Sequence, residues 1–147
     1  MYGEEDEMST VIRPEISKKN PYYISKHRYY ELKHFCLQYP EWKRDYLYLG
    51  DLIKTGNFSR GEKSENNPVE SAVSKRLYVR TKMETVEKAA KQADSDIGDY
   101  ILKAVTEDLS FVQLKMQYEI PCERDMYYDR YRKFFYILNL TLNNQTI

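Results

Sequence analysis

The sequence predicts an all-α protein in which N-terminal helices and one long helix lead to a C-terminal group of three helices. The 147-residue chain has only five glycines and five prolines, fewer than the turns of an all-β sandwich of this length require. Apolar residues recur at helical spacing in several segments. Helix-start signals precede two of these segments, at Asn67-Pro68 and at Ser110.

The first 53 residues divide into a polar arm and a helical segment. Residues 1–20 show no hydrophobic periodicity, so we expect a flexible N-terminal arm. Within residues 21–53, apolar residues follow helical spacing from Ser25 to about Tyr39, and Pro40 marks the break. The sequence therefore predicts one helix that ends before this proline.

A second, short helix is predicted from Pro40 through Leu49, because proline is tolerated in the first turn of a helix. Gly50 follows and suggests the carboxyl end of this helix. The next stretch, residues 54–67, is rich in glycine, serine, asparagine and charged residues. We interpret it as a loop or linker.

Residues 68–94 are predicted to form the long helix, with Asn67 as its N-cap and Pro68 at its first position. Arg76 interrupts its apolar stripe, which consists of Ala72, Val79, Met83, Val86 and Ala90. A single stripe of this length is compatible with packing inside one chain or with a homodimer. We favour packing inside the chain.

The region 95–142 combines three helical patterns. A short helix is expected near 97–105, and Ser110-Phe111-Val112-Gln113 fits a capping box that starts a second helix, with Leu114 and Tyr118 facing inward. The segment 119–122 then forms a turn before a third helix, whose inward stripe is Tyr127, Tyr131, Phe134 and Leu138. Three short helices with a tight turn before the last are typical of a helix-turn-helix.

The outward face of the third helix carries the candidate DNA-binding residues, which are Arg124, Asp125, Tyr128, Asp129, Arg132 and Lys133. Arginine binds guanine or phosphate through two hydrogen bonds, lysine binds phosphate, and tyrosine contacts phosphate or a thymine methyl group. The two aspartates would be repelled by the phosphates unless one of them accepts a hydrogen bond from a cytosine amine. A three-helix bundle without any role in DNA binding is the alternative for this region.

Charge is unevenly distributed along the chain. The 23 basic and 23 acidic side chains cancel, yet residues 4–7 are all acidic and residues 11–46 carry an excess of four basic side chains. This basic zone would suit a nucleic acid, although a solvated surface of mixed charge explains it as well. The 15 tyrosines suit either a small aromatic core or the margin between a core and a polar partner.

The string LKMQYEIPCERDMYYDRYRKFF, residues 114–135, resembles the C-terminal helix-turn-helix of phage transcriptional regulators of the RinA and ArpU type, which are similar to the fourth region of sigma factors. The pair Tyr39-Pro40, the polar loop and the opening Asn67-Pro68-Val69-Glu70 extend the resemblance over most of residues 25–140. It implies a regulator of phage or prophage late genes that binds double-stranded promoter DNA, with contact to host RNA polymerase left open. The chain departs from the common motif at Lys115, Glu119 and Met126.

Signals of catalysis are weak. His27, Glu31 and His34 fall on one helical face, but no fourth metal ligand is identifiable and the two histidines are about 10 Å apart along the axis. Cys36 and Cys122 form neither a zinc motif nor a disulfide framework. No Gly-rich phosphate loop or nucleophile elbow occurs. The sequence thus predicts no enzyme activity, no metal and no cofactor.

Two other classes of function stay open. One is a phage packaging adaptor, such as a small terminase subunit, which joins a similar DNA reader to a ring-forming helix. The other is a protein-interaction module, such as an inhibitor of host machinery, that does not bind DNA. The sequence has neither an apolar run long enough for a membrane span nor a secretory signal, so we expect a cytoplasmic protein.

Overall fold

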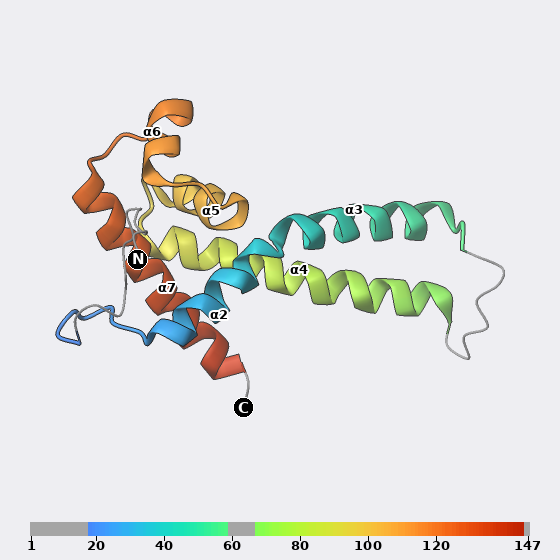
Figure 1. The fold of residues 1–147 in the computed structure, drawn as a ribbon. Helices are drawn as coiled ribbons and strands as arrows, with labels where there is room; N and C mark the ends of the chain where they lie inside the picture. Colours follow the sequence, from blue (N-terminus) through green and yellow to red (C-terminus); the bar gives the residue numbers. More distant parts are fainter. Residues whose placement is uncertain (1–17, 59–66, 146–147) are drawn as a thin grey trace.

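The computed structural model describes residues 18–58 and 67–145, and every regular element in these ranges is an α-helix (Figure 1). The predicted all-α class is confirmed. The helices are α2 (Lys26–Leu37), α3 (Tyr39–Thr55), α4 (Pro68–Ala93), α5 (Gly98–Glu107), α6 (Phe111–Tyr118) and α7 (Arg124–Gln145). None of these helices is long and apolar enough to cross a membrane. Most of the predicted arm at 1–20 and the middle of the predicted loop at 54–67 lie outside the described residues.

The two N-terminal helices begin close to their predicted starts. Ser25 is the N-cap of α2, and its hydroxyl oxygen accepts a hydrogen bond from the backbone N–H of Arg28 (3.4 Å). Only Gln38 separates the end of α2 from α3, which carries Pro40 in its first turn. The predicted break at this proline is therefore the joint between two helices.

The predicted end of the second helix at Gly50 is wrong, because α3 continues to Thr55 and ends at Gly56. Gly56 has a φ of +67°, a left-handed conformation that favours glycine, and its N–H donates to the carbonyl of Leu52 (2.9 Å). Gly50 lies instead where α4 approaches α3, and a Cβ at this position would stand 2.6 Å from Nη2 of Arg76. Its small size leaves room for this guanidinium.

The long helix α4 begins and ends as predicted. The side chain of Asn67 accepts hydrogen bonds from the N–H groups of Val69 (2.9 Å) and Glu70 (3.5 Å). The predicted apolar stripe packs inside the chain, since Ala72, Val79, Val86 and Ala90 are buried and Met83 is half-buried. Arg76, which interrupts this stripe, lies with its guanidinium carbon 3.7 Å from the ring centroid of Tyr46 and donates to the Tyr46 carbonyl (2.9 Å).

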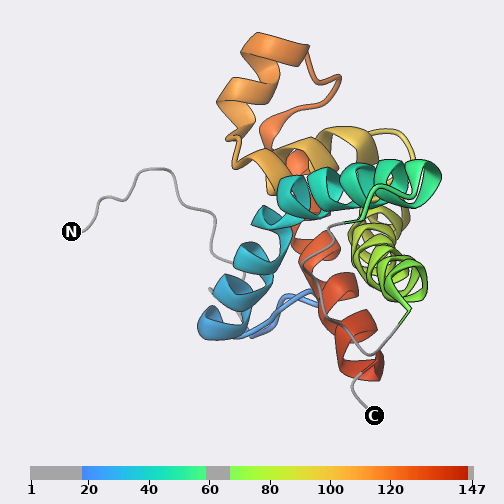
Figure 2. The same cartoon turned by 90° about the vertical axis from the view of Figure 1, so that its right-hand side faces the viewer.

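Helices α3 and α4 run antiparallel as a hairpin whose outer half extends away from the other helices (Figures 1 and 2). The carboxyl-terminal half of α4 enters a cluster with α2, α5 and α7. The largest side chains buried in this cluster come from these helices, from α6 and from the turns before α5 and α7: Leu32, Val86, Ile97, Ile101, Leu114, Ile120, Tyr127, Phe134, Phe135 and Leu138. The hairpin and the start of α7 therefore lie at opposite ends of the molecule.

The C-terminal third forms the three expected helices. Ser110 and Gln113 make the predicted capping box at the start of α6, and Leu114 is buried. The inward position predicted for Tyr118 is wrong: its side chain is 39% exposed. Tyr118 is the last residue of α6, and the left-handed Glu119 (φ +54°) turns the chain away at that point.

Candidate nucleic-acid interface

The turn between α6 and α7 is fixed by a buried side chain and a lysine. Ile120 is fully buried, which holds the middle of the turn against the core. The ammonium group of Lys115 donates to the carbonyl oxygens of Ile120 and Cys122, both at 3.1 Å. Lys115, a departure from the common motif, is therefore a structural residue that closes the turn. Its charge is directed into the turn that precedes α7.

The first turn of α7 is open to solvent. Arg124, Asp125 and Met126 are exposed. The guanidinium carbon of Arg124 lies 5.3 Å from the ring centroid of Phe111 and 6.0 Å from that of Tyr128. These two rings, one from α6 and one from α7, support the arginine, because aromatic faces attract cations. Tyr128 itself is half-buried against Phe111.

The second predicted aspartate, Asp129, forms an ion pair with Arg130. Arg130 also donates through Nε to a carboxylate oxygen of Asp94 (3.0 Å), which lies just after α4. The negative charge of Asp129 is thus balanced by a neighbouring cation. Asp125 has no ion pair within the described residues.

The remaining candidates are less accessible than the helical pattern predicted. Arg132 and Lys133 are half-buried, and Nε of Arg132 is buried without a hydrogen-bond partner among the described residues. Tyr136, three residues after Lys133, packs against Tyr22 with their ring centroids 5.7 Å apart. The structure therefore brings Arg124, Asp125 and Tyr128 together at one exposed end of α7, and places Arg132 and Lys133 on its covered middle.

The carboxyl-terminal half of α7 is held by α2. Arg28 donates to the side-chain oxygens of Asn139 (2.6 Å) and Asn143 (3.0 Å). The hydroxyl groups of Tyr29 and Tyr131 share a hydrogen bond of 2.7 Å. Part of the predicted basic zone and several tyrosines are thus used to fix α7 inside the cluster. Sequence reasoning missed these contacts because their partners lie more than 100 residues apart in the chain.

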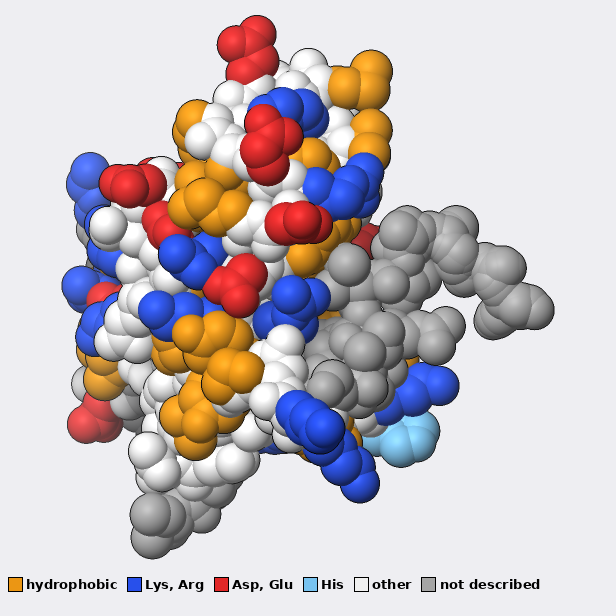
Figure 3. Space-filling model, turned by 90° about the vertical axis from the view of Figure 1, so that its left-hand side faces the viewer, with side chains coloured by type: hydrophobic (Ala, Val, Ile, Leu, Met, Phe, Trp, Pro, Cys, Tyr) orange, Lys and Arg blue, Asp and Glu red, His pale blue; other side chains and the backbone are white. Residues whose placement is uncertain are grey.

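The surface around the start of α7 carries both signs of charge. Figure 3 looks onto this side and shows acidic, basic and hydrophobic side chains interspersed, without a continuous basic field. An interface here would depend on individual side chains more than on overall attraction. Within the described residues, no group of three histidine, cysteine or acidic side chains is placed to hold a metal ion, and this includes His27, Glu31 and His34.

Comparisons with protein-family models, with curated proteins and with solved structures found no match to this chain.

Proposed function

We propose that the protein is a transcriptional regulator that binds double-stranded DNA with the first turns of α7. The observation that supports this proposal is the contrast between the first turn of that helix and its middle. Arg124, Asp125 and Met126 are exposed, whereas Phe134, Phe135 and Leu138 are buried. A helix that is anchored through its middle and exposed at its amino end has the form needed to enter a major groove about 12 Å wide.

The side chains at this end fit the roles of base and phosphate contacts. Arg124 is held by Phe111 and Tyr128 with its guanidinium at the surface, where it would donate to guanine or phosphate. Tyr128 would touch a phosphate or a thymine methyl group. Because Asp129 is paired with Arg130, the acidic side chains that oppose the phosphates are Asp125 and the exposed Glu123 just before the helix, unless Asp125 accepts from a cytosine amine. Arg132 and Lys133 belong at the flanking phosphates, one to two turns further on.

The resemblance of residues 114–135 to RinA and ArpU-type regulators supports a specific form of this proposal. The target is then a promoter of phage or prophage late genes, and the protein acts in the cytoplasm. Host RNA polymerase would be the second partner of such a regulator. A direct contact between the regulator and the polymerase would distinguish activation of transcription from DNA binding alone.

The test is a fluorescence-anisotropy titration on DNA fragments from the source genome and on random-sequence DNA. Arg124→Ala should weaken binding to the preferred fragment by about 5- to 100-fold and reduce the preference over random DNA, since a bidentate base contact contributes about 1–3 kcal/mol. Lys54→Ala is the matched control, because Lys54 is an exposed cation in the last turn of α3. This variant should bind as the wild type does.

Two results would contradict the proposal. One is the absence of salt-dependent binding to any DNA, because phosphate contacts release counterions. The other is an equal effect of Arg124→Ala and Lys54→Ala. Either result would favour the protein-interaction module, for which the exposed Val112 and Met116 of α6 offer apolar contacts beside the same turn.

A further inference from the structure

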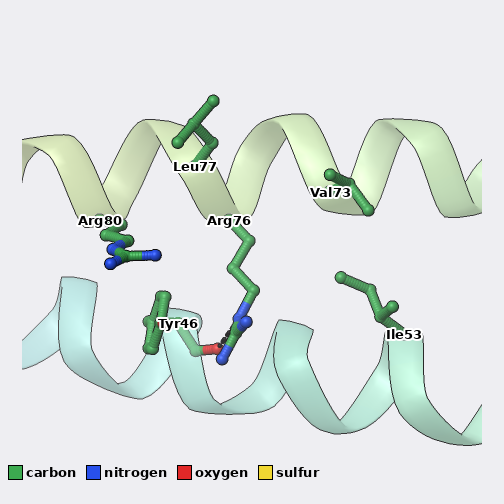
Figure 4. Close-up of a pocket in the computed structure, with 6 residues that line it drawn as sticks. All are labelled: Tyr46, Ile53, Val73, Arg76, Leu77 and Arg80. Carbon is green, nitrogen blue, oxygen red and sulfur yellow. Dashed lines mark hydrogen bonds between the residues drawn. The ribbon is translucent and has the colours of Figure 1, made fainter.

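The outer half of the α3–α4 hairpin exposes a second stripe of α4. Its members follow one another at spacings of three, four and three: Glu70, Val73, Leu77 and Arg80. All four are exposed, with Val73 at 48% and Leu77 at 62%. Beside this stripe, Val73, Leu77 and Arg80 line a groove of about 320 Å³ together with Tyr46 and Ile53 of α3 (Figure 4).

This stripe is separate from the one that packs inside the chain. At 100° per residue its centre lies roughly 135° around α4 from the centre of the buried stripe of Ala72, Val79 and Val86. Figure 4 shows Val73 directed toward Ile53 across the groove and Leu77 directed away from α3. Two neighbouring aliphatic side chains thus stay in water although α3 is already in place, so this face of α4 is left uncovered by the hairpin itself.

We infer that a second copy of this chain covers the stripe, with the two α4 helices antiparallel about a two-fold axis near position 75. In an antiparallel pair, residues at equal distances on either side of the centre face one another. Val73 then meets the partner's Leu77, and Glu70 meets the partner's Arg80. By symmetry each contact occurs twice. This inference goes beyond the DNA-binding proposal and does not depend on it.

The order of charged residues along the stripe favours a second copy of the chain, packed in the antiparallel direction. An acid, two aliphatic residues and a base form a pattern that complements itself when one copy is reversed, whereas a parallel pair would place Glu70 beside Glu70 and Arg80 beside Arg80. Arg80 also donates through Nε to Glu84 (3.0 Å) on the exposed surface. A guanidinium has five N–H donors, so this bond leaves others for the partner's Glu70.

The face of the hairpin approaches the size of a standard interface. The 17 residues of α3 span about 25 Å, and two helices side by side measure about 20 Å across, so one face of the hairpin covers roughly 500 Å² in projection. Because side chains project from this face, its accessible area is larger than its projection and comes closer to the value for a stable interface, which is about 800 Å² per partner. Two hairpins packed face to face form a four-helix bundle, in which the groove residues Tyr46 and Ile53 join a core.

The first test is sedimentation equilibrium of the full chain over a wide range of concentrations. The wild type should form a dimer. Leu77→Glu should raise the dimer dissociation constant by about tenfold or more, because it places a charge opposite the partner's Val73. Tyr48→Glu is the matched control: this 64% exposed residue of α3 follows Tyr46 by two positions and so points about 160° away from it. It should leave the dimer unchanged, and far-ultraviolet circular dichroism should show the same helix content in both variants.

The second test uses charge reversal. Glu70→Arg and Arg80→Glu should each weaken self-association by about tenfold, since each variant alone sets like charges at both ends of the pair. An equimolar mixture of the two variants should form a heterodimer, because opposite charges then meet at both ends. A wild type that stays monomeric, equal effects of Leu77→Glu and Tyr48→Glu, or a mixture that fails to associate would overturn the inference. A closed ring of many subunits would also overturn it and favour a packaging adaptor.

Discussion

Asp94 links three helices through one carboxylate. One oxygen accepts from the N–H groups of Asp96 (2.7 Å) and Ile97 (3.0 Å), which shapes the turn before α5. The other oxygen accepts from Nε of Arg130 on α7 (3.0 Å). Burial disfavours the charged form of Asp94, but these hydrogen bonds and the arginine outweigh it and hold its pKa below the ordinary value of 3.8. The folded state therefore favours the ionised carboxylate.

This lowered pKa predicts a pH-dependent contribution to stability. The ionised Asp94 stabilises the fold at neutral pH, and its contribution is lost as the pH falls below 3.8 and through the lower pKa of the folded state. Asp94→Asn should reduce the free energy of unfolding by about 1 kcal/mol at pH 7. The variant loses the ion pair with Arg130, and the effect is modest because Arg130 is partly exposed and water screens the pair. Urea titrations at neutral pH and near pH 3 measure this difference. A difference that persists undiminished at low pH would contradict the assignment.

The aromatic residues of α7 predict which single truncations are costly. Phe134 is fully buried, and its ring packs edge-on against Phe135 with centroids 4.8 Å apart. Phe134→Ala should therefore cost about 3–5 kcal/mol of unfolding free energy, a large share of the total for a domain of this size. Met126→Ala, on the exposed start of the same helix, should cost less than about 0.5 kcal/mol. Similar urea midpoints for the two variants would show that the inward face of α7 is assigned wrongly.

At the scale of elements, two glycines of the helices have different tasks. A Cβ on Gly98 would stand 2.8 Å from the carbonyl oxygen of Ala90, which is rigid backbone of α4. A Cβ on Gly50 would meet the guanidinium of Arg76, the mobile end of a long side chain. Gly98 thus sets how closely α5 approaches α4, while Gly50 leaves room for the side chain of Arg76.

This difference predicts opposite tolerance to alanine. Gly98→Ala should lower the free energy of unfolding by roughly 1–3 kcal/mol, because α4 and α5 must separate. Gly50→Ala should stay within about 1 kcal/mol of the wild type, since the gain in helix propensity offsets a displaced Arg76. Thermal unfolding followed by circular dichroism compares the two variants directly. If Gly50→Ala proves the more damaging, the stacking of Arg76 on Tyr46 matters more than the approach of α5 to α4.

The sequence predicted those parts of the elements that depend on near neighbours. The caps at Asn67 and Ser110 were correct because a cap is formed by residues two or three positions apart. The end at Gly50 was wrong because packing between α3 and α4 decides what this glycine does. The pairing of Arg130 with Asp94 was not predicted, since a separation of 36 residues leaves no local pattern. The helical wheel likewise placed Arg132 outward, because it contains no information on distant parts of the chain; in the structure Arg132 is half-buried. The DNA-contact roles stay predictions.

At the scale of the whole molecule, the two proposed surfaces lie far apart. The start of α7 and the outer half of the hairpin are at opposite ends of the arrangement in Figure 1. A dimer formed through α4 would therefore leave both copies of the α7 start exposed. Two binding ends on one symmetric assembly suit a DNA site made of two half-sites.

This geometry predicts how salt affects DNA binding by the assembly. If each chain neutralises about three phosphates, the slope of log K against log salt is roughly −3 for one chain and about twice that for a dimer. The wild type should show the steeper slope, and Leu77→Glu should show the shallower one, because its change lies at the hairpin, away from α7. Anisotropy titrations at several salt concentrations between about 50 and 200 mM give both slopes. Tyr48→Glu should keep the steep slope. A Leu77→Glu variant that is monomeric by sedimentation yet keeps the wild-type slope would mean that a single chain makes all the phosphate contacts, and the dimer would then have no part in DNA binding.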